Sequence, residues 1–98
     1  MTHIIRLTVG DLEFEAQLNE SETAQAIYDA LPLQFHGSRW GEEYYGRVDV
    51  QMTEADDARS EMAVGELAYW PPGTAFCIFF GPTPASYGNE PRAASPVN

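Results

Sequence analysis

The last third of the chain decides the fold: "YWPPGTAFCIFFGPTPASYGNEPRAASPVN", from Tyr69 to Asn98. It places an apolar run, Ala75 to Phe80, between a Pro-Pro-Gly segment and a long stretch of proline, glycine and small polar residues. Such a run predicts a strand that passes through the interior. Alternate side chains face opposite sides of a strand. One face carries Phe76, Ile78 and Phe80, and the other carries Ala75, Cys77 and Phe79.

A strand that is apolar on both faces needs two covers. We expect one face to fill a core and the Gly81–Asn98 segment to form a loop over the other. Ordered loops over apolar walls often build ligand pockets. The sequence therefore predicts a pocket between this strand, the Arg39–Glu43 segment and the Gly81–Arg92 loop.

The N-terminal segment predicts a β-hairpin. Apolar and polar residues alternate from Ile5 to Val9 and again from Leu12 to Leu18, which is typical of half-buried strands. Gly10-Asp11 between them is a tight-turn sequence.

One helix follows the hairpin. Asn19 is its predicted N-cap and Glu22 the reciprocal capping residue. An apolar face recurs at helical spacing, and Pro32 ends the pattern. The face consists of Ala24, Ile27, Tyr28 and Leu31.

Further strands are predicted at 33–39, 44–50 and 66–70, with an exposed acidic turn over 53–61. Gly46 within a strand indicates a bulge or a close backbone approach. Pro72-Gly73 predicts a type II turn with a positive φ at Gly73. Together these elements predict a mainly β fold: a small closed antiparallel barrel with one short α-helix, forming a single domain over residues 1–98.

The composition excludes several classes of partner. The formal charge is −10, and all five basic residues are arginine. Such a chain repels phosphate backbones and anionic lipid surfaces, so neither nucleic acid nor a membrane is an expected partner. The longest apolar run has six residues, and no basic segment opens the chain ahead of a long apolar one. We therefore expect a cytoplasmic protein.

No strong catalytic or cofactor motif is present. The sequence lacks phosphate-binding loops, dinucleotide fingerprints, HExxH, CxxC and GxSxG. The acidic residues of 53–61 lack calcium-loop spacing. No metal, cofactor or catalytic residue is therefore predicted. Cys77 is expected to be buried and inert, and His36 to be a surface or hydrogen-bonded histidine.

Arg39-Trp40-Gly41-Glu42-Glu43 has two interpretations. Arginine presents planar donors suited to a carboxylate or a carbonyl, and tryptophan offers a stacking face. A ligand could use both. Alternatively, Arg39 forms an internal ion pair with a neighbouring glutamate, and Trp40 belongs to the core. Arg92, close to Glu90, has the same two interpretations. We expect Arg39 to be free of an internal ion pair and open to a ligand.

Three strings carry a family resemblance: "SRWGEEYYGRV", "VGELAYWPPGTAFCIFFGPTP" and "NEPRAASPVN". With the hairpin and helix, they identify the chain as similar to the cyclophilin-like family of small, uncharacterised bacterial and archaeal proteins. The resemblance covers nearly the whole chain and implies a reduced cyclophilin barrel. It implies no established activity.

The resemblance has two departures. Cyclophilins proper carry an arginine followed by a Phe-x-x-Gln-Gly-Gly segment, whereas Arg39 is followed by Trp40-Gly41-Glu42-Glu43. Prolyl isomerase activity is therefore not expected. Relatives also continue past this Pro-Val-Asn into a closing strand, so either the final strand is short or a barrel edge stays open.

The sequence thus predicts a barrel that binds a small molecule or peptide in a loop-lined aromatic pocket. The alternatives are a prolyl isomerase, and an interaction module that uses an open barrel edge. A homo-oligomer is compatible with each. The predicted ligand-binding residues are Arg39, Trp40, Glu42, Tyr69, Trp70, Phe79, Thr83 and Arg92.

Overall fold

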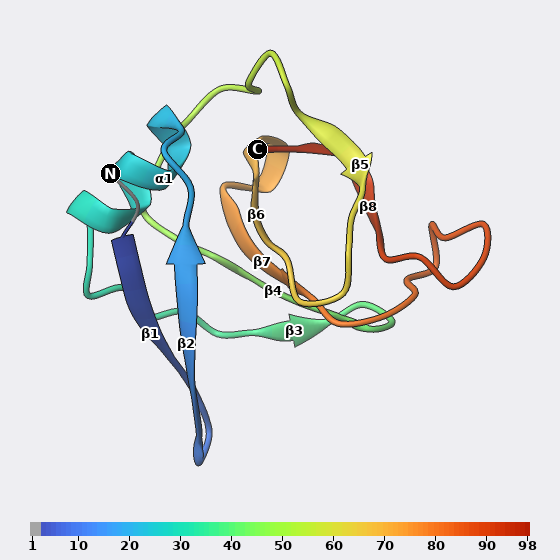
Figure 1. Ribbon diagram of the computed structural model, residues 1–98, viewed down its shortest axis with the longest axis horizontal. Coiled ribbons are helices and arrows are strands. Elements are labelled where there is room, and N and C mark those ends of the chain that lie inside the picture. Colours follow the sequence, from blue (N-terminus) through green and yellow to red (C-terminus); the bar gives the residue numbers. More distant parts are fainter. Residues whose placement is uncertain (1–2) are drawn as a thin grey trace. The chain divides into compact units, whose positions relative to one another are not determined.

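The computed structural model describes residues 3–98, which divide into two compact units, one up to residue 31 and one from residue 32 to residue 98. A single domain over the whole chain stays a prediction. The first unit contains β1 (His3–Val9), β2 (Leu12–Leu18) and α1 (Glu22–Asp29). The second contains β3 (Ser38–Arg39), β4 (Glu43–Arg47), β5 (Arg59–Glu61), β6 (Leu67–Trp70), the 3₁₀ turn η1 (Pro71–Gly73), β7 (Ala75–Phe79) and β8 (Arg92–Val97) (Figure 1).

The N-terminal hairpin is as predicted. β1 and β2 pair antiparallel, and the pairing of Val9 with Leu12 leaves Gly10 and Asp11 as a two-residue turn. Gly10 has a φ of +59°, a conformation that costs glycine little. Ile5 and Leu18 are buried, whereas Leu12 and Phe14 near the turn are exposed.

The helix begins later than the sequence pattern predicted. The N-cap is Ser21, whose Oγ accepts a hydrogen bond from the Ala24 backbone N–H at 3.1 Å. Asn19, the predicted cap, instead accepts from the Ser21 backbone N–H at 3.0 Å, so it orders the approach to the helix. Ile27 is buried at the centre of the apolar face. Within residues 3–98, no helix has the length and apolar character needed to cross a membrane.

The second unit is organised around β7. Its main sheet has the order β3-β4-β7-β6, and both neighbours of β7 are antiparallel to it (Figure 1). Ala75, Phe76, Cys77 and Phe79 are all buried, which confirms that this strand passes through the interior. The other strands are shorter than predicted: 33–39 contributes only Ser38–Arg39, and 44–50 contributes Glu43–Arg47.

The two faces of β7 are covered differently. On one face, buried residues form a hydrophobic cluster against which Tyr45 and Trp70 pack. Its members are Met62, Ala68, Ala75, Cys77, Phe79, Ala93 and Val97. On the other face, the rings of Phe76 and Phe35 lie 5.8 Å apart. Gly46 allows this packing, because a Cβ there would lie 2.1 Å from the Phe35 ring. The predicted close approach at Gly46 is confirmed.

The Pro-Pro-Gly segment is a 3₁₀ turn rather than the predicted type II turn. The positive φ, +45°, belongs to Thr74 and not to Gly73. Gly73 is required for a different reason, because a Cβ on it would lie 2.6 Å from the Trp70 ring. The tryptophan ring packs against the turn and excludes any larger residue there.

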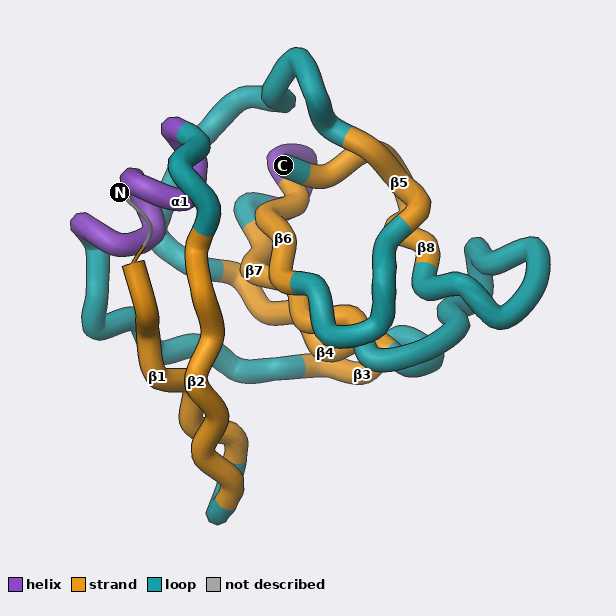
Figure 2. The backbone as a smooth tube through the Cα atoms, in the orientation of Figure 1, coloured by secondary structure: helices purple, strands orange, loops and turns teal. Residues whose placement is uncertain are grey.

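The C-terminal segment is only partly a loop. Figure 2 shows a loop between β7 and β8, and then a strand where a loop was predicted. β8 pairs antiparallel with β5, with a register shift between Arg59 and Glu61. The loop was predicted from the proline and small residues of this segment. Such residues can also occupy a strand at the edge of a sheet, so composition alone does not distinguish the two.

The predicted closed barrel is wrong. Strands in residues 3–98 form three separate sheets: β1-β2, β3-β4-β7-β6 and β5-β8. Among residues 3–98, the backbones of β8 and β6 are joined by the two hydrogen bonds that Asn98 and Tyr69 exchange, of 3.0 and 2.8 Å. In an antiparallel ladder the next such pair would be Pro96 with Pro71. Neither proline has an N–H to donate, so the ladder that would join these two sheets cannot extend.

Candidate ligand pocket

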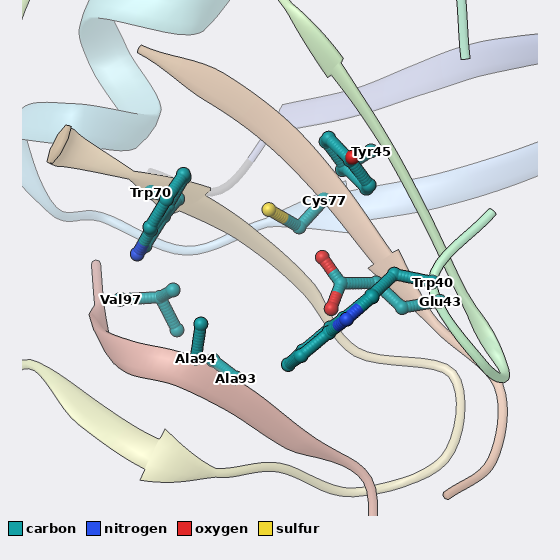
Figure 3. Close-up of a pocket in the computed structure, with 8 residues that line it drawn as sticks. All are labelled: Trp40, Glu43, Tyr45, Trp70, Cys77, Ala93, Ala94 and Val97. Atoms are coloured by element: carbon teal, nitrogen blue, oxygen red, sulfur yellow. The ribbon is translucent and has the colours of Figure 1, made fainter. Parts of the chain in front are cut away.

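A pocket of about 270 Å³ opens within the second unit, beside β7. Its walls come from the loop before β4, from β4 itself, and from β6, β7 and β8 (Figure 3). The lining residues are Trp40, Glu43, Tyr45, Trp70, Cys77, Ala93, Ala94 and Val97. Most of this surface is aromatic or aliphatic, and Glu43 supplies the one carboxyl group of the lining.

Two tryptophans and a tyrosine give the pocket its aromatic character. Trp40 and Trp70 are half-buried, so each ring has one part against the protein and another part accessible. The Nε1–H of Trp70 donates a 2.7 Å hydrogen bond to Oγ of Ser95, which fixes the orientation of that ring. Tyr45 is also half-buried and lies on β4, two residues after Glu43.

The Glu43 carboxyl is the unusual group of the pocket. Its residue is 5% exposed, and Oε1 has no hydrogen-bond partner within the described part of the chain. Figure 3 shows the carboxyl group pointing into the space between Trp40, Trp70 and Val97. Burial raises the pKa of Glu43 above its ordinary value, and a hydrogen bond with the Cys77 thiol offsets part of that rise. A buried oxygen without a partner is costly.

Cys77 lies next to this carboxyl group and is 2% exposed. Burial and then the charge of Glu43 raise the pKa of its thiol. A thiol that resists ionisation is a poor nucleophile. The predicted burial of this cysteine is confirmed, and its neighbourhood does not favour reactivity.

Two of the eight predicted ligand-binding residues, Trp40 and Trp70, line the pocket. Tyr69 and Phe79 are core residues, exposed by 2% and 0%. The Tyr69 hydroxyl donates to the Val50 carbonyl and accepts from the Met52 backbone N–H. Neither of these two aromatic residues lines the pocket.

Arg39 is not free, so that expectation is wrong. Its Nη2 lies 3.2 Å from Oε2 of Glu42, and its Nε donates to the Gly41 carbonyl. The guanidinium also lies over the Phe80 ring, 5.4 Å from its centroid. Both Arg39 and Glu42 remain about half-exposed, with side-chain exposures of 56% and 46%. They form a surface pair outside the pocket lining.

Arg92 is also engaged internally. Its Nε lies 3.0 Å from Oε2 of Glu90, its Nη2 lies 3.2 Å from Oε1 of Glu61, and its guanidinium lies over the Tyr87 ring at 4.3 Å. The buried Thr83 hydroxyl donates to the Arg92 carbonyl. These contacts order the loop before β8, and neither residue lines the pocket.

Sequence reasoning missed Glu43 because it began the strand at Tyr44 and placed Glu43 in a loop. One more residue of strand would have put Glu43 on the same face as Tyr45. It also expected the third wall from the Gly81–Arg92 loop, whereas Ala93, Ala94 and Val97 of β8 provide it. Across residues 3–98, no group of three histidine, cysteine or acidic side chains is placed to hold a metal ion.

Comparison with known proteins identifies the family. A family model described as cyclophilin-like matches residues 3–98. The chain belongs to the cyclophilin-like family. The resemblance seen in the sequence is thus confirmed, as is a mainly β fold with one short helix.

A solved structure supports the same assignment. The solution structure of the hypothetical protein AF2241 from Archaeoglobus fulgidus is 39% identical, with a TM-score of 0.80 over 100% of this chain and 75% of that one. That protein is itself described only as hypothetical. No curated protein matches the chain significantly. The family therefore establishes the fold and leaves the activity to be argued from the pocket.

Proposed function

We propose that this cyclophilin-like protein binds a small organic molecule in the pocket beside β7. Glu43 is the polar anchor, and Trp40 and Trp70 are the apolar walls. The unpaired Oε1 of Glu43 carries the proposal, because it is buried, faces the pocket and has no partner in the described chain. A ligand that bonds to this oxygen would remove the cost of burying it.

The size of the pocket favours a small ligand. A volume of about 270 Å³ is close to the lower end of the range of about 300–1,000 Å³ for ligand sites. At about 30 Å³ for each water molecule in the liquid, it would hold on the order of nine waters. One ring or short chain with a polar group fits this volume, whereas an extended peptide would leave most of its length outside.

The aromatic walls supply contact area at low entropic cost, because their rings are held before a ligand arrives. Trp70 is fixed by its bond to Ser95, and Tyr45 packs against the buried cluster. Such pre-organisation improves affinity.

Nuclear magnetic resonance titration tests this function. Small aromatic and aliphatic molecules with one polar group are added to the protein, and the indole N–H signals of Trp40 and Trp70 are followed. We expect at least one such molecule to shift both signals saturably, with a weaker effect in Glu43→Gln. If no member of a broad panel moves either signal, the proposal is wrong.

The alternative of an interaction module has weaker support. Edge strands of useful length exist, because β1, β2 and β8 have seven, seven and six residues and each belongs to a two-stranded sheet. Their outer backbone groups could pair with another strand, but no observation within residues 3–98 indicates such a partner, whereas the pocket holds a buried oxygen without a partner. The pocket is therefore the better basis for a function.

A further inference from the structure

Three aromatic side chains surround a carboxyl group in the pocket: Trp40, Tyr45 and Trp70 around Glu43 (Figure 3). The faces of aromatic rings carry partial negative charge. They attract ammonium and guanidinium groups placed over them, most strongly when water is excluded. The aromatic rings and the Glu43 carboxyl group therefore favour the same kind of ligand, one with a positive charge.

Among residues 3–98, no basic side chain forms an ion pair with this carboxyl group. None of the eight lining residues is arginine or histidine. Three of the arginines pair with other acids: Arg39 with Glu42, Arg59 with Glu66, and Arg92 with Glu61 and Glu90. A formal charge of −10 for the whole chain also draws cations toward its surface.

A metal ion does not fit the pocket. Calcium and magnesium require several oxygen ligands, whereas the lining offers one carboxyl group, one phenol and one thiol among apolar carbons. An organic cation needs fewer polar contacts, because its carbon atoms can pack on the apolar wall formed by Ala93 and Val97.

We propose that the ligand is an organic ammonium ion that carries at least one N–H. The nitrogen lies among the aromatic rings and donates a hydrogen bond to Oε1 of Glu43, while its hydrocarbon part contacts β8. This inference rests on the proposed function and narrows it to one chemical class. An N–H is required because a quaternary ammonium ion would leave Oε1 without a donor.

The pH dependence separates this ligand from a neutral one. An ammonium ion pairs with the ionised carboxyl group, so its affinity rises as pH increases through the raised pKa of Glu43. A neutral hydrogen-bond acceptor needs the protonated carboxyl group and shows the reverse trend. The other titratable groups facing Glu43 are Tyr45 on β4 and Cys77 on β7. Burial keeps the Cys77 thiol protonated. The ligand also keeps its charge, because alkylamines stay protonated between about pH 5 and about pH 8, as lysine does with a pKa of about 10.4.

The test uses three probes of nearly equal size: benzylammonium, benzyl alcohol and benzoate. Each is titrated at about pH 5 and about pH 8 while the indole N–H signals of Trp40 and Trp70 are followed. We expect benzylammonium to bind at least about tenfold more tightly than benzyl alcohol at the higher pH, and benzoate not to bind. Glu43→Gln should remove this preference. Glu42→Gln, at the exposed neighbour, is the matched control and should keep it.

Each contrary result has a definite meaning. If benzyl alcohol binds as well as benzylammonium, or better at low pH, the ammonium inference is wrong while the proposed pocket function stands. If both glutamine variants weaken benzylammonium equally, its binding reflects the general surface charge, which also overturns the inference. If none of the three probes moves either indole signal in the wild-type protein, the ammonium inference is wrong, and the proposed pocket function fails with it only if the broad panel also leaves both signals unmoved.

Discussion

Tyr69 and Asn98 exchange both of their backbone hydrogen bonds, and this pair is the point where β8 joins β6. The Asn98 side chain adds two more bonds: its Oδ1 accepts from the Ala55 backbone N–H at 2.7 Å, and its Nδ2 donates to the Thr53 carbonyl at 2.8 Å. One residue therefore holds β8, β6 and the 53–55 segment together. Because β8 forms one wall of the pocket, this junction also shapes the pocket.

Asn98→Ala should destabilise the second unit by about 1–3 kcal/mol, because it leaves the Ala55 N–H and the Thr53 carbonyl without partners. Urea unfolding measures the loss. Asn98→Asp keeps an acceptor for the Ala55 N–H but loses the donor to the Thr53 carbonyl. Its stability should therefore lie between those of the wild type and the alanine variant. Equal stability of all three proteins would show that the side-chain bonds do not matter.

Glu43→Gln should be more stable than the wild type at neutral pH. The folded state raises the pKa of this carboxyl group, mainly through burial. Between the unfolded and folded pKa values, the folded state holds more protons than the unfolded state, so stability falls as pH rises. Thermal melts should therefore give nearly equal melting temperatures for the two proteins near about pH 4. Above that pH, the melting temperature of Glu43→Gln should increasingly exceed that of the wild type. A wild type that gains stability relative to the variant as pH rises would contradict this.

Glu90→Gln should show the opposite pH trend. Hydrogen bonds from the backbone N–H of Tyr87, from the Arg92 side chain and from the Gly88 N–H lower the pKa of Glu90 to about 2. The stability gained from this carboxylate is present above the unfolded pKa and is lost as pH falls toward about 2. The wild type should thus melt at a higher temperature than the variant at neutral pH, and the two should converge in acid. Glu13→Gln, on β2, serves as the control.

Trp70→Ala should cost about 3 kcal/mol, at the lower end of the range for large aromatic truncations, because the ring is half-buried. Ser95→Ala removes only the acceptor for the indole N–H and should cost about 1 kcal/mol. Urea unfolding of both variants measures these losses. A larger loss for Ser95→Ala than for Trp70→Ala would mean that the hydrogen bond, rather than the packing, holds this wall.

Prolyl isomerase activity should be undetectable on proline tetrapeptides. The Gln-bearing segment of cyclophilins proper is missing, and Arg39 is engaged with Glu42 and lies over Phe80. A protease-coupled assay with an ordinary cyclophilin as the reference checks this. Turnover at a tenth or more of the reference rate that is abolished by Arg39→Ala would refute the expectation.

Local pattern was sufficient for part of the fold. Strict alternation and a Gly-Asp turn predicted the N-terminal hairpin, because adjacent strands joined by two residues leave only one simple pairing. The apolar run at 75–80 predicted the interior strand for a similar reason, since neither face of it suits water. The cap at Ser21 was missed by two residues, because asparagine and serine are both good caps and the helix could begin after either.

The pocket was harder to predict, because its parts come from separated segments. Trp40 and Trp70 were chosen for their ring faces, and both line it. Arg39 and Arg92 were chosen for their charge, but nearby glutamates engage them. Glu43 looked like one more acidic residue beside Glu42. Only the extension of β4 by one residue distinguishes the two: it buries Glu43 and leaves Glu42 partly exposed.

The sequence by itself determined the hairpin, the helix, the buried strand and the family, because each depends on short-range periodicity or on contiguous strings. The tertiary structure decided which carboxyl group is buried, which arginines are paired, and where the strands stop pairing. These depend on residues distant in the chain: Cys77 lies beside Glu43 on the neighbouring strand, and the ladder that starts at Tyr69 and Asn98 would next need Pro71 and Pro96, which have no N–H. Burial and hydrogen bonding are properties of that three-dimensional arrangement, and a local pattern cannot specify them.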